Sequence, residues 1–265
     1  MPHSEKKKWA MDKHKIFELL ERDLEKETIS EVIGKMETLL AYFKENPQYL
    51  GLVPFLETYY LVTKKVAEKR IQQENYYNHP GDLEKLDVVF ASLYFRPLAT
   101  YLKTGKANPP WSGYFDYCEK DGIPFLKMLL GINAHINTDL CITLISLGYR
   151  HKNDYFVIND ILDEVIPEIM HFLAFTSHDI FGISGLFFKK IVEKEFRKTV
   201  VQWRQHAWNN ALAISTGSYP DYHTKLNKCT EETCVRLIAT FHELRRPFSI
   251  PKFNLKLEKA LVKFE

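Results

Sequence analysis

The sequence predicts an all-α fold, a single-domain multi-helix bundle. Three observations support this class: apolar residues recur with the 3.6-residue period of an α-helix, no stretch alternates apolar and polar residues long enough for a β-sheet, and Pro, Gly and Asn clusters separate the periodic segments. The chain has 265 residues, 45% of them hydrophobic and 14% aromatic, which is enough to bury one large core. We expect a frayed tail at residues 1–12 and one domain over residues 13–265.

The helix boundaries follow from local start and stop signals. The expected helices lie at residues 13–27, 29–45, 52–73, 83–102, 111–120, 123–147, 155–175, 186–214 and 231–245, with a loop at 176–185. Pro47 ends the second helix because proline cannot continue a helix, whereas Pro54 is tolerated in the first turn of the third. Pro97 is expected to kink or end the fourth helix.

The later helices have similar signals. Asn153 or Asp154 is expected to cap the helix over 155–175, and Pro167 is expected to kink it. Thr230, followed by two glutamates, is a typical start for the last helix, because its hydroxyl can accept a hydrogen bond from a free N–H group and the acids favour the positive end of the helix dipole. The helix over 123–147 has apolar residues on most faces and is expected to be the most buried.

Composition and charge argue against several classes of protein. Lys and Arg number 36 against 34 Asp and Glu, so the basic footprint of a nucleic-acid-binding protein is missing. The N-terminus has no apolar h-region, and apolar stretches are interrupted before the roughly 18 to 20 residues of a membrane span, so we expect a cytoplasmic protein without such a span. Cys118, Cys141, Cys229 and Cys234 match no zinc or redox spacing and are expected to be reduced thiols.

Four polar residues interrupt the helix expected to be most buried. The segment GINAHINTDL (131–140) carries Asn133, His135, Asn137 and Asp139, which form two i, i+4 pairs on opposite sides of an apolar stripe. Burying such groups without partners costs several kcal/mol, so neighbouring helices, water, a metal or a ligand must satisfy them. His135 and Asp139 are either a metal or acid–base pair or a buried hydrogen bond that fixes packing, and the asparagines either join that site or bond an adjacent backbone.

Two weaker patterns lie on the predicted helix over 155–175. Glu168 and His171 have the Glu-x-x-His spacing of di-iron bundles, but a second such motif is missing. DILDE (160–164) resembles the aspartate-rich Mg²⁺–diphosphate motif of isoprenoid cyclases, again without a second metal motif. Signatures of Ser/His/Asp hydrolases, P-loops and dinucleotide-binding proteins are missing from the sequence.

Four segments together carry a more specific pattern. They are LDVVFASLYF (86–95), LLGINAHINTDL (129–140), NDYFVINDIL (153–162) and WRQHAWNNAL (203–212). In this order they resemble a bacterial family of all-helical proteins classed as a domain of unknown function, over about residues 55–215, and GINAHINxDL is the most specific block. The resemblance implies a helical fold and a set of positions, not a reaction. Those positions are Asp87, Tyr94, Asn133, His135, Asn137, Asp139, Asn159, Asp160, Arg204 and Trp208.

We expect these positions to line one cavity. The expected catalytic residues are His135, Asp139, Asn133, Asn137 and Asp160, with His135 and Asp139 as ligands if a divalent metal binds. The expected substrate-binding residues are Asp87, Tyr94, Asn159, Arg204, Trp208 and Tyr59. Either Asp87 or Asp160 should reach the cavity of the His135–Asp139 pair, because buried charges require partners.

The function expected from this cavity is that of an intracellular enzyme acting on a small, largely apolar metabolite, with a divalent metal as an open option for its cofactor. Two alternatives remain. One is a non-catalytic helical module that binds an apolar molecule or a protein partner, and the other is an Mg²⁺-dependent enzyme similar to isoprenoid cyclases.

Overall fold

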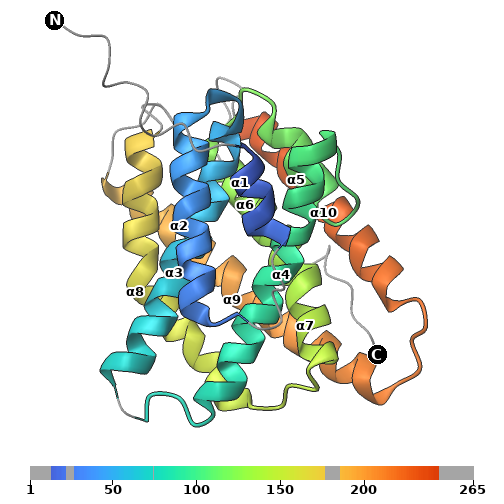
Figure 1. The fold of residues 1–265 in the computed structure, drawn as a ribbon. Coiled ribbons are helices and arrows are strands. Elements are labelled where there is room, and N and C mark those ends of the chain that lie inside the picture. Colours follow the sequence, from blue (N-terminus) through green and yellow to red (C-terminus); the bar gives the residue numbers. More distant parts are fainter. Residues whose placement is uncertain (1–12, 22–26, 74, 177–185, 245–265) are drawn as a thin grey trace, which may run out of the picture.

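The computed structural model describes residues 13–21, 27–73, 75–176 and 186–244. Within these ranges the chain is helical and contains no β-strand, which confirms the predicted class (Figure 1). The elements are α1 (Lys13–Glu21), α2 (Ile29–Glu45), the 3-10 helix η2 (Pro47–Leu52), α3 (Val53–Gln72), α4 (Pro80–Thr104), α5 (Ser112–Cys118), α6 (Pro124–Ala134), the π-helix η3 (His135–Leu140), α7 (Cys141–Ser146), α8 (Lys152–Thr176), α9 (Leu186–Thr216) and α10 (Tyr222–Leu244). The predicted tail at 1–12 and the predicted loop beyond Thr176 lie outside the described residues.

Local signals set the boundaries of the first helices. Thr28 caps α2, because its hydroxyl accepts a hydrogen bond from the Glu31 N–H while the Glu31 carboxylate accepts one from the Thr28 N–H. The chain leaves α2 at Pro47, as predicted, and passes through η2 before α3 begins. Pro54 lies in the first turn of α3, also as predicted.

Tertiary packing overrides two of the predicted boundaries. Pro97 does not end α4, because buried residues on both sides of it, among them Phe95 and Leu98, keep the helix packed and outweigh one lost backbone hydrogen bond. The other boundary is the start of α8, which begins at Lys152, so Asp154 lies inside its first turn. The Asp154 carboxylate instead accepts hydrogen bonds from the backbone N–H groups of Asn78 and His79 at the start of α4.

The last helix also differs from the prediction. It begins at Tyr222, so Thr230 lies inside α10 and is not its N-cap. Thr230 is 1% exposed, and its hydroxyl lies 2.8 Å from the Thr138 hydroxyl of the central helix. The residue that looked like a helix start therefore joins two helices.

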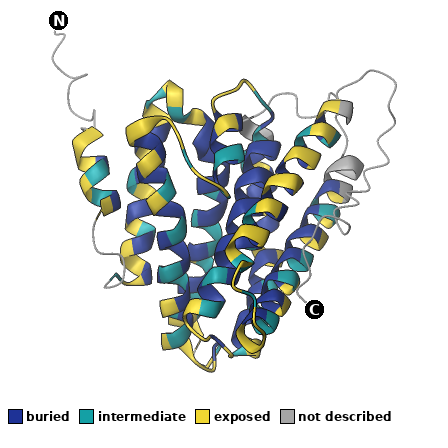
Figure 2. Cartoon of the chain, turned by 90° about the vertical axis from the view of Figure 1, so that its right-hand side faces the viewer, coloured by how far each residue is buried: buried dark blue, intermediate teal, exposed yellow. Residues whose placement is uncertain are grey.

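The helix predicted at 123–147 is the centre of the fold. α6, η3 and α7 follow one another without interruption over residues 124–146 and form one rod, which contacts α3, α4, α5, α8, α9 and α10. By length and composition this stretch could cross a membrane, but 89% of its apolar window is buried inside the bundle. Figure 2 shows the same inward burial across the bundle, with exposed faces confined to the outside of the surrounding helices.

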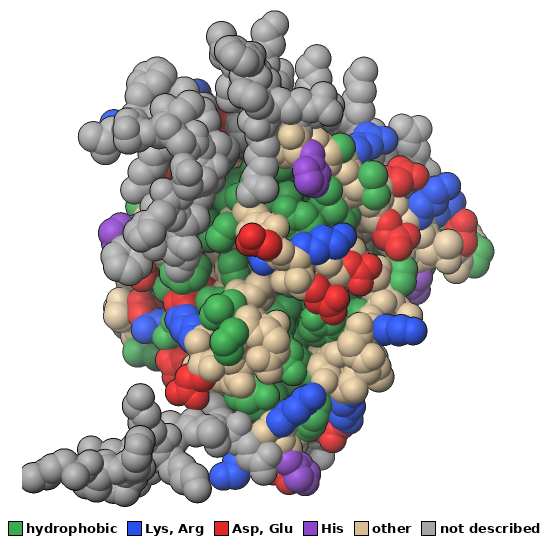
Figure 3. Space-filling model, turned by 90° about the horizontal axis from the view of Figure 1, so that it is seen from above, with side chains coloured by type: hydrophobic (Ala, Val, Ile, Leu, Met, Phe, Trp, Pro, Cys, Tyr) green, Lys and Arg blue, Asp and Glu red, His purple; other side chains and the backbone are tan. Residues whose placement is uncertain are grey.

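Two further features are the distribution of surface charge and the state of the cysteines. On the face shown in Figure 3, basic and acidic side chains are interspersed rather than gathered by sign. All four cysteines are buried free thiols. Burial raises the pKa of Cys118 and of Cys141 to about 12, so both remain protonated and unreactive at neutral pH.

Candidate functional site

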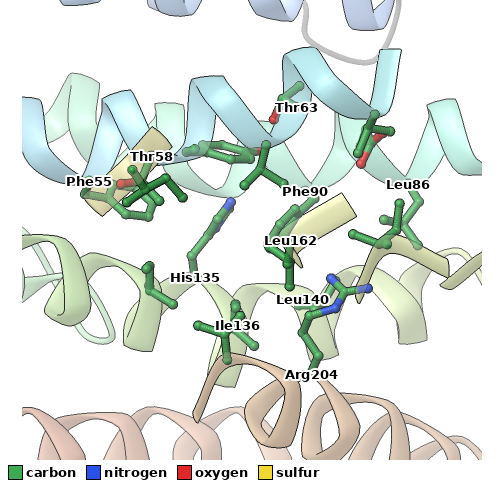
Figure 4. Close-up of a pocket in the computed structure, with 18 of the residues that line it drawn as sticks. Phe55, Thr58, Thr63, Leu86, Phe90, His135, Ile136, Leu140, Leu162 and Arg204 are labelled. Carbon is green, nitrogen blue, oxygen red and sulfur yellow. The ribbon is translucent and has the colours of Figure 1, made fainter. Parts of the chain in front are cut away.

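A cavity of about 90 Å³ lies between α3, α4, the central rod, α8 and α9; we call it the central cavity. This volume holds several water molecules or part of a small ligand. Aliphatic and aromatic side chains make up most of its lining (Figure 4). The polar side chains that reach it are Thr58, Tyr59, Thr63, Asp87, His135, Tyr155 and Arg204.

His135 is held rigidly in this cavity. Its imidazole stacks on the Phe90 ring, with centroids 3.5 Å apart and planes 7° from parallel, and meets the edge of Tyr59 at 4.6 Å. Its Nδ1 lies 3.0 Å from Oδ2 of Asp139. Its Nε2 is buried and has no hydrogen-bond partner among the described residues. Figure 4 shows the ring reaching from the central rod into the cavity.

Asp139 lies behind His135 and does not line the cavity. Its Oδ2 also accepts a hydrogen bond of 3.0 Å from the indole N–H of Trp111, a residue 28 positions away in the sequence. Burial raises the pKa of Asp139 well above its usual range, against the opposing effect of the Trp111 hydrogen bond, and lowers the pKa of His135 well below its usual range. The low-dielectric surroundings thus favour a pair without net charge and leave Nε2 as the ring nitrogen that faces the cavity.

The backbone around this pair is a π-helix. The segment His135–Leu140 adopts i→i+5 hydrogen bonding between two α-helical halves, and such short π segments occur frequently at functional sites. Sequence periodicity assumes a regular helix and gave no sign of it. The π segment begins at His135 and includes Asp139. The pair of these two residues, which we call the dyad, therefore lies on the irregular part of the rod.

Asp87 reaches the cavity from α4. Its side chain is half-buried, and its Oδ2 has no hydrogen-bond partner in the described part of the chain. Burial raises the pKa of Asp87 to about 7, and the nearby Arg204 limits that rise. The expectation that either Asp87 or Asp160 reaches the cavity of His135 is therefore met by Asp87, although Asp139 itself stays behind the histidine.

Arg204 reaches the cavity from α9 and is 8% exposed. Its Nε donates a 3.0 Å hydrogen bond to Oδ1 of Asn159, and its Nη2 donates one of 2.6 Å to the Tyr155 carbonyl. The guanidinium carbon lies 4.5 Å from the centroid of the Tyr155 ring. Asn159 and Tyr155 therefore fix the position of the cation.

The two predicted asparagines face away from the cavity. Asn137 Nδ2 donates to Asn133 Oδ1 at 2.9 Å, and Asn133 Nδ2 donates to the Thr230 carbonyl at 2.9 Å. Neither side chain lines the cavity. The two amides therefore attach α10 to the central rod, as in the packing alternative. The catalytic role expected for Asn133 and Asn137 is not supported.

Four other predicted residues are also outside the lining, and one of them, Asn159, instead accepts the hydrogen bond from Arg204. Asp160 is exposed, because the buried face of α8 is formed by its aliphatic residues, and the catalytic role expected for it has no support. Tyr94 is fully buried against Phe55 and does not reach the cavity. Trp208 packs against Tyr155 with ring centroids 4.9 Å apart, so it supports the tyrosine on which Arg204 stacks.

The donor groups of the dyad do not fit a divalent metal. Nδ1 of His135 and Oδ2 of Asp139 point at each other at hydrogen-bonding distance instead of converging on a third point. Nowhere in the described ranges do three or more His, Cys, Asp or Glu side chains form a group able to hold a metal ion. The metal-ligand role expected for His135 and Asp139 is therefore not supported by their geometry.

The two weaker metal motifs lie on the outer face of α8. Glu168 and His171 are exposed, so the Glu-x-x-His spacing does not point into the bundle. Within DILDE, Asp163 pairs with Arg197, and Glu164 pairs with Lys69 at 2.6 Å. These carboxylates are engaged by surface cations and do not reach the cavity.

Trp111 is a part of the site that the sequence did not predict, because it was considered only as the start of a short helix. No local signal connects it with His135. Only the packing of α5 against the central rod brings its indole to the dyad. Phe90, in the segment LDVVFASLYF, lines the cavity and stacks on His135.

A protein-family model matches residues 29–241 of the chain. The chain belongs to DUF5995, a family of unknown function. The match is wider than the span of about 55–215 expected from the four segments, and in this chain it takes in α2 and nearly all of α10. Comparison with curated proteins and with solved structures finds no match. Membership of DUF5995 therefore brings no activity with it, and function must be argued from the cavity.

Proposed function

We propose that the protein binds a small, largely apolar molecule in the central cavity and acts on it by acid–base catalysis through His135. The observation that carries this proposal is Nε2 of His135, which is buried in a mostly apolar cavity and lacks a partner among the described residues, while Nδ1 is held by Asp139. A buried polar atom without a partner costs about 1–3 kcal/mol. A ligand hydroxyl or carbonyl that meets Nε2 would remove that cost.

The surrounding residues have distinct parts in this proposal. Phe90 and Tyr59 hold the imidazole plane, and Asp139, held in turn by Trp111, orients the ring and tunes its basicity. Asp87 has a pKa of about 7 and is the lining group able to exchange protons near neutral pH. The mostly apolar lining lowers the local dielectric constant and so strengthens the electrostatic interactions inside the cavity.

A non-catalytic carrier is the second candidate, because a mostly apolar lining suffices to bind a ligand without chemistry. The isoprenoid cyclase alternative has no such support, since Asp163 and Glu164 are paired with surface cations. We place either activity inside the cell. Four cysteines that remain free thiols are typical of a reducing compartment.

The test uses two probes of nearly the same shape, p-cresol and toluene, of which only p-cresol carries a hydroxyl. Binding is measured by calorimetry and by the rise in melting temperature. The Nε2 resonance of His135 is followed by NMR in protein labelled with ¹⁵N-histidine. A His135→Phe variant assigns that resonance among the ten histidines of the chain and keeps an aromatic ring against Phe90.

We expect both probes to bind to the wild type, p-cresol more tightly, and only p-cresol to move the Nε2 resonance. The preference for p-cresol should disappear in His135→Phe. Binding of both probes without a change at Nε2 would favour the carrier. If neither probe binds, the cavity is not a binding site and the proposal fails.

A further inference from the structure

We infer that the natural ligand is an apolar monocarboxylate, with its carboxylate held between Arg204 and Asp87 and its apolar chain directed toward His135. This inference rests on the proposed function, because it assigns a ligand class to the same cavity. It specifies that the polar end of the ligand is negatively charged, which the proposed function leaves open.

Arg204 is a buried cation with spare binding capacity. Its Nε and Nη2 are engaged by Asn159 and Tyr155, whereas Nη1 has no hydrogen-bond partner in the described ranges. Among the described residues the guanidinium makes no ion pair with a carboxylate, although the side chain is only 8% exposed. A buried charge without a counterion is unfavourable, and a carboxylate is the group that a guanidinium binds best.

The other charges near Asp87 are already paired or neutral. Arg70, on α3, makes an ion pair of 2.5 Å with Glu84, on α4, so these two largely cancel. The tyrosines that Asp87 influences electrostatically all have raised pKa values and stay uncharged at neutral pH; they are Tyr59, Tyr77 and Tyr149. Arg204 is therefore the cation left to act on a ligand at this end of the cavity.

Asp87 adapts the site to an anion. Because its pKa is about 7, the carboxyl accepts a proton near neutral pH at little free-energy cost. The protonated carboxyl can donate a hydrogen bond to a ligand carboxylate, while Arg204 supplies the opposite charge. An ammonium head group would face a guanidinium that keeps its proton at all physiological pH values, so it is disfavoured.

The shape of the cavity also sets the direction of the ligand's apolar chain. Figure 4 shows His135 and Arg204 at separate positions along the cavity, with the aliphatic side chains of Leu140 and Leu162 in the region between them. A carboxylate at Arg204 thus places an apolar chain along these leucines. A hydroxyl or carbonyl on this apolar chain, away from the head group, is then the ligand group that meets Nε2 of His135.

The experiment compares hexanoate, 1-hexanol and hexylamine, which share one chain and differ in head-group charge. Calorimetric titrations are run at pH 6, 7 and 8 on the wild type and on Asp87→Asn and Arg204→Gln. Asp160→Asn, which removes an exposed carboxylate outside the cavity, is the matched control. Circular dichroism and melting curves confirm that each variant is folded, and if Arg204→Gln does not fold, Asp87→Asn alone decides.

For the wild type we expect hexanoate to bind most tightly and to weaken roughly tenfold from pH 6 to pH 8, because the protonated fraction of a group with a pKa of about 7 falls by about that factor. Asp87→Asn should bind hexanoate without this pH dependence, and Arg204→Gln should lose hexanoate but retain 1-hexanol. The inferred carboxylate head group is wrong if 1-hexanol binds as tightly as hexanoate or more tightly and the affinity for hexanoate does not change with pH. It is also wrong if hexylamine binds most tightly. In both cases the apolar cavity of the proposed function stands, whereas failure of all three probes overturns both.

Discussion

Asp87 should make the folded protein less stable at neutral pH than it would be without this carboxylate. Its pKa rises from a usual value of 3.8 to about 7 in the folded protein, mainly through burial. At about 1.36 kcal/mol for each pKa unit, ionising this carboxyl costs the folded state about 4 kcal/mol of unfolding free energy. The side chain is half-buried, so solvent in the cavity lowers the figure, and we expect about 2–4 kcal/mol.

The direction of the pH dependence follows from proton counts. Between about pH 4 and pH 7 the folded protein retains a proton on Asp87 that the unfolded chain has already lost. The contribution of this group to stability is therefore fully present below pH 4, falls as pH rises through that window, and is constant above pH 7. An asparagine imitates the protonated carboxyl and cannot ionise.

Urea unfolding of the wild type and of Asp87→Asn, at pH 5, 6, 7 and 8, measures this difference. We expect the variant to be more stable by about 1–2 kcal/mol at pH 5 and by about 2–4 kcal/mol at pH 8. Comparing the two proteins at each pH cancels the titration of all other groups, and Asp160→Asn should show no such trend because Asp160 is exposed. A difference that stays constant from pH 5 to pH 8 would refute the raised pKa.

Three further substitutions separate packing from site chemistry. Asn133→Ala removes two buried hydrogen bonds, one to the Thr230 carbonyl and one from the Asn137 amide, and should lower the unfolding free energy by about 2–4 kcal/mol in urea, with p-cresol affinity unchanged per folded molecule. His135→Phe should lower stability by only about 1–2 kcal/mol, since a ring remains in place, but should abolish the calorimetric preference for p-cresol over toluene. Gly131→Ala should lower the melting temperature and cost about 1–3 kcal/mol, because its Cβ would lie 2.4 Å from Cγ of Phe55. A stable Gly131→Ala protein with unchanged toluene binding would contradict this packing.

The fold could be predicted largely from the sequence, because burial in a helical bundle leaves a 3.6-residue period along the chain. The central rod was predicted at 123–147 and observed at 124–146. The start of α10 was misplaced because Thr230 followed by two glutamates imitates an N-cap, whereas the structure uses this threonine to contact Thr138. A capping signal is local, and packing between distant helices can override it.

The site was only partly predictable, for the same reason. The spacing of His135 and Asp139 was enough to give their hydrogen bond as one of two alternatives, since it depends on one helix alone. The spacing of Asn133 and Asn137 is identical, yet these residues face α10, because the direction of a helix face depends on its neighbours. Asp160 follows apolar residues much as Asp87 does, and only the structure shows that it faces solvent.

The π segment of the central rod also determines how the chain tolerates changes in length. A π turn holds one residue more than an α-helical turn, so removing a single residue within His135–Leu140 would restore a regular helix. A deletion in the α-helical parts of the rod would instead turn the residues that follow by about 100° and shorten the rod by about 1.5 Å. Because α6 contacts α3 and α10 while α7 contacts α9, one half would then lose its partners. Within the π segment the same deletion replaces a π turn by an α turn, so both halves keep nearly the same direction toward their partners. The rod can thus lose one residue at the place where the chain carries its dyad.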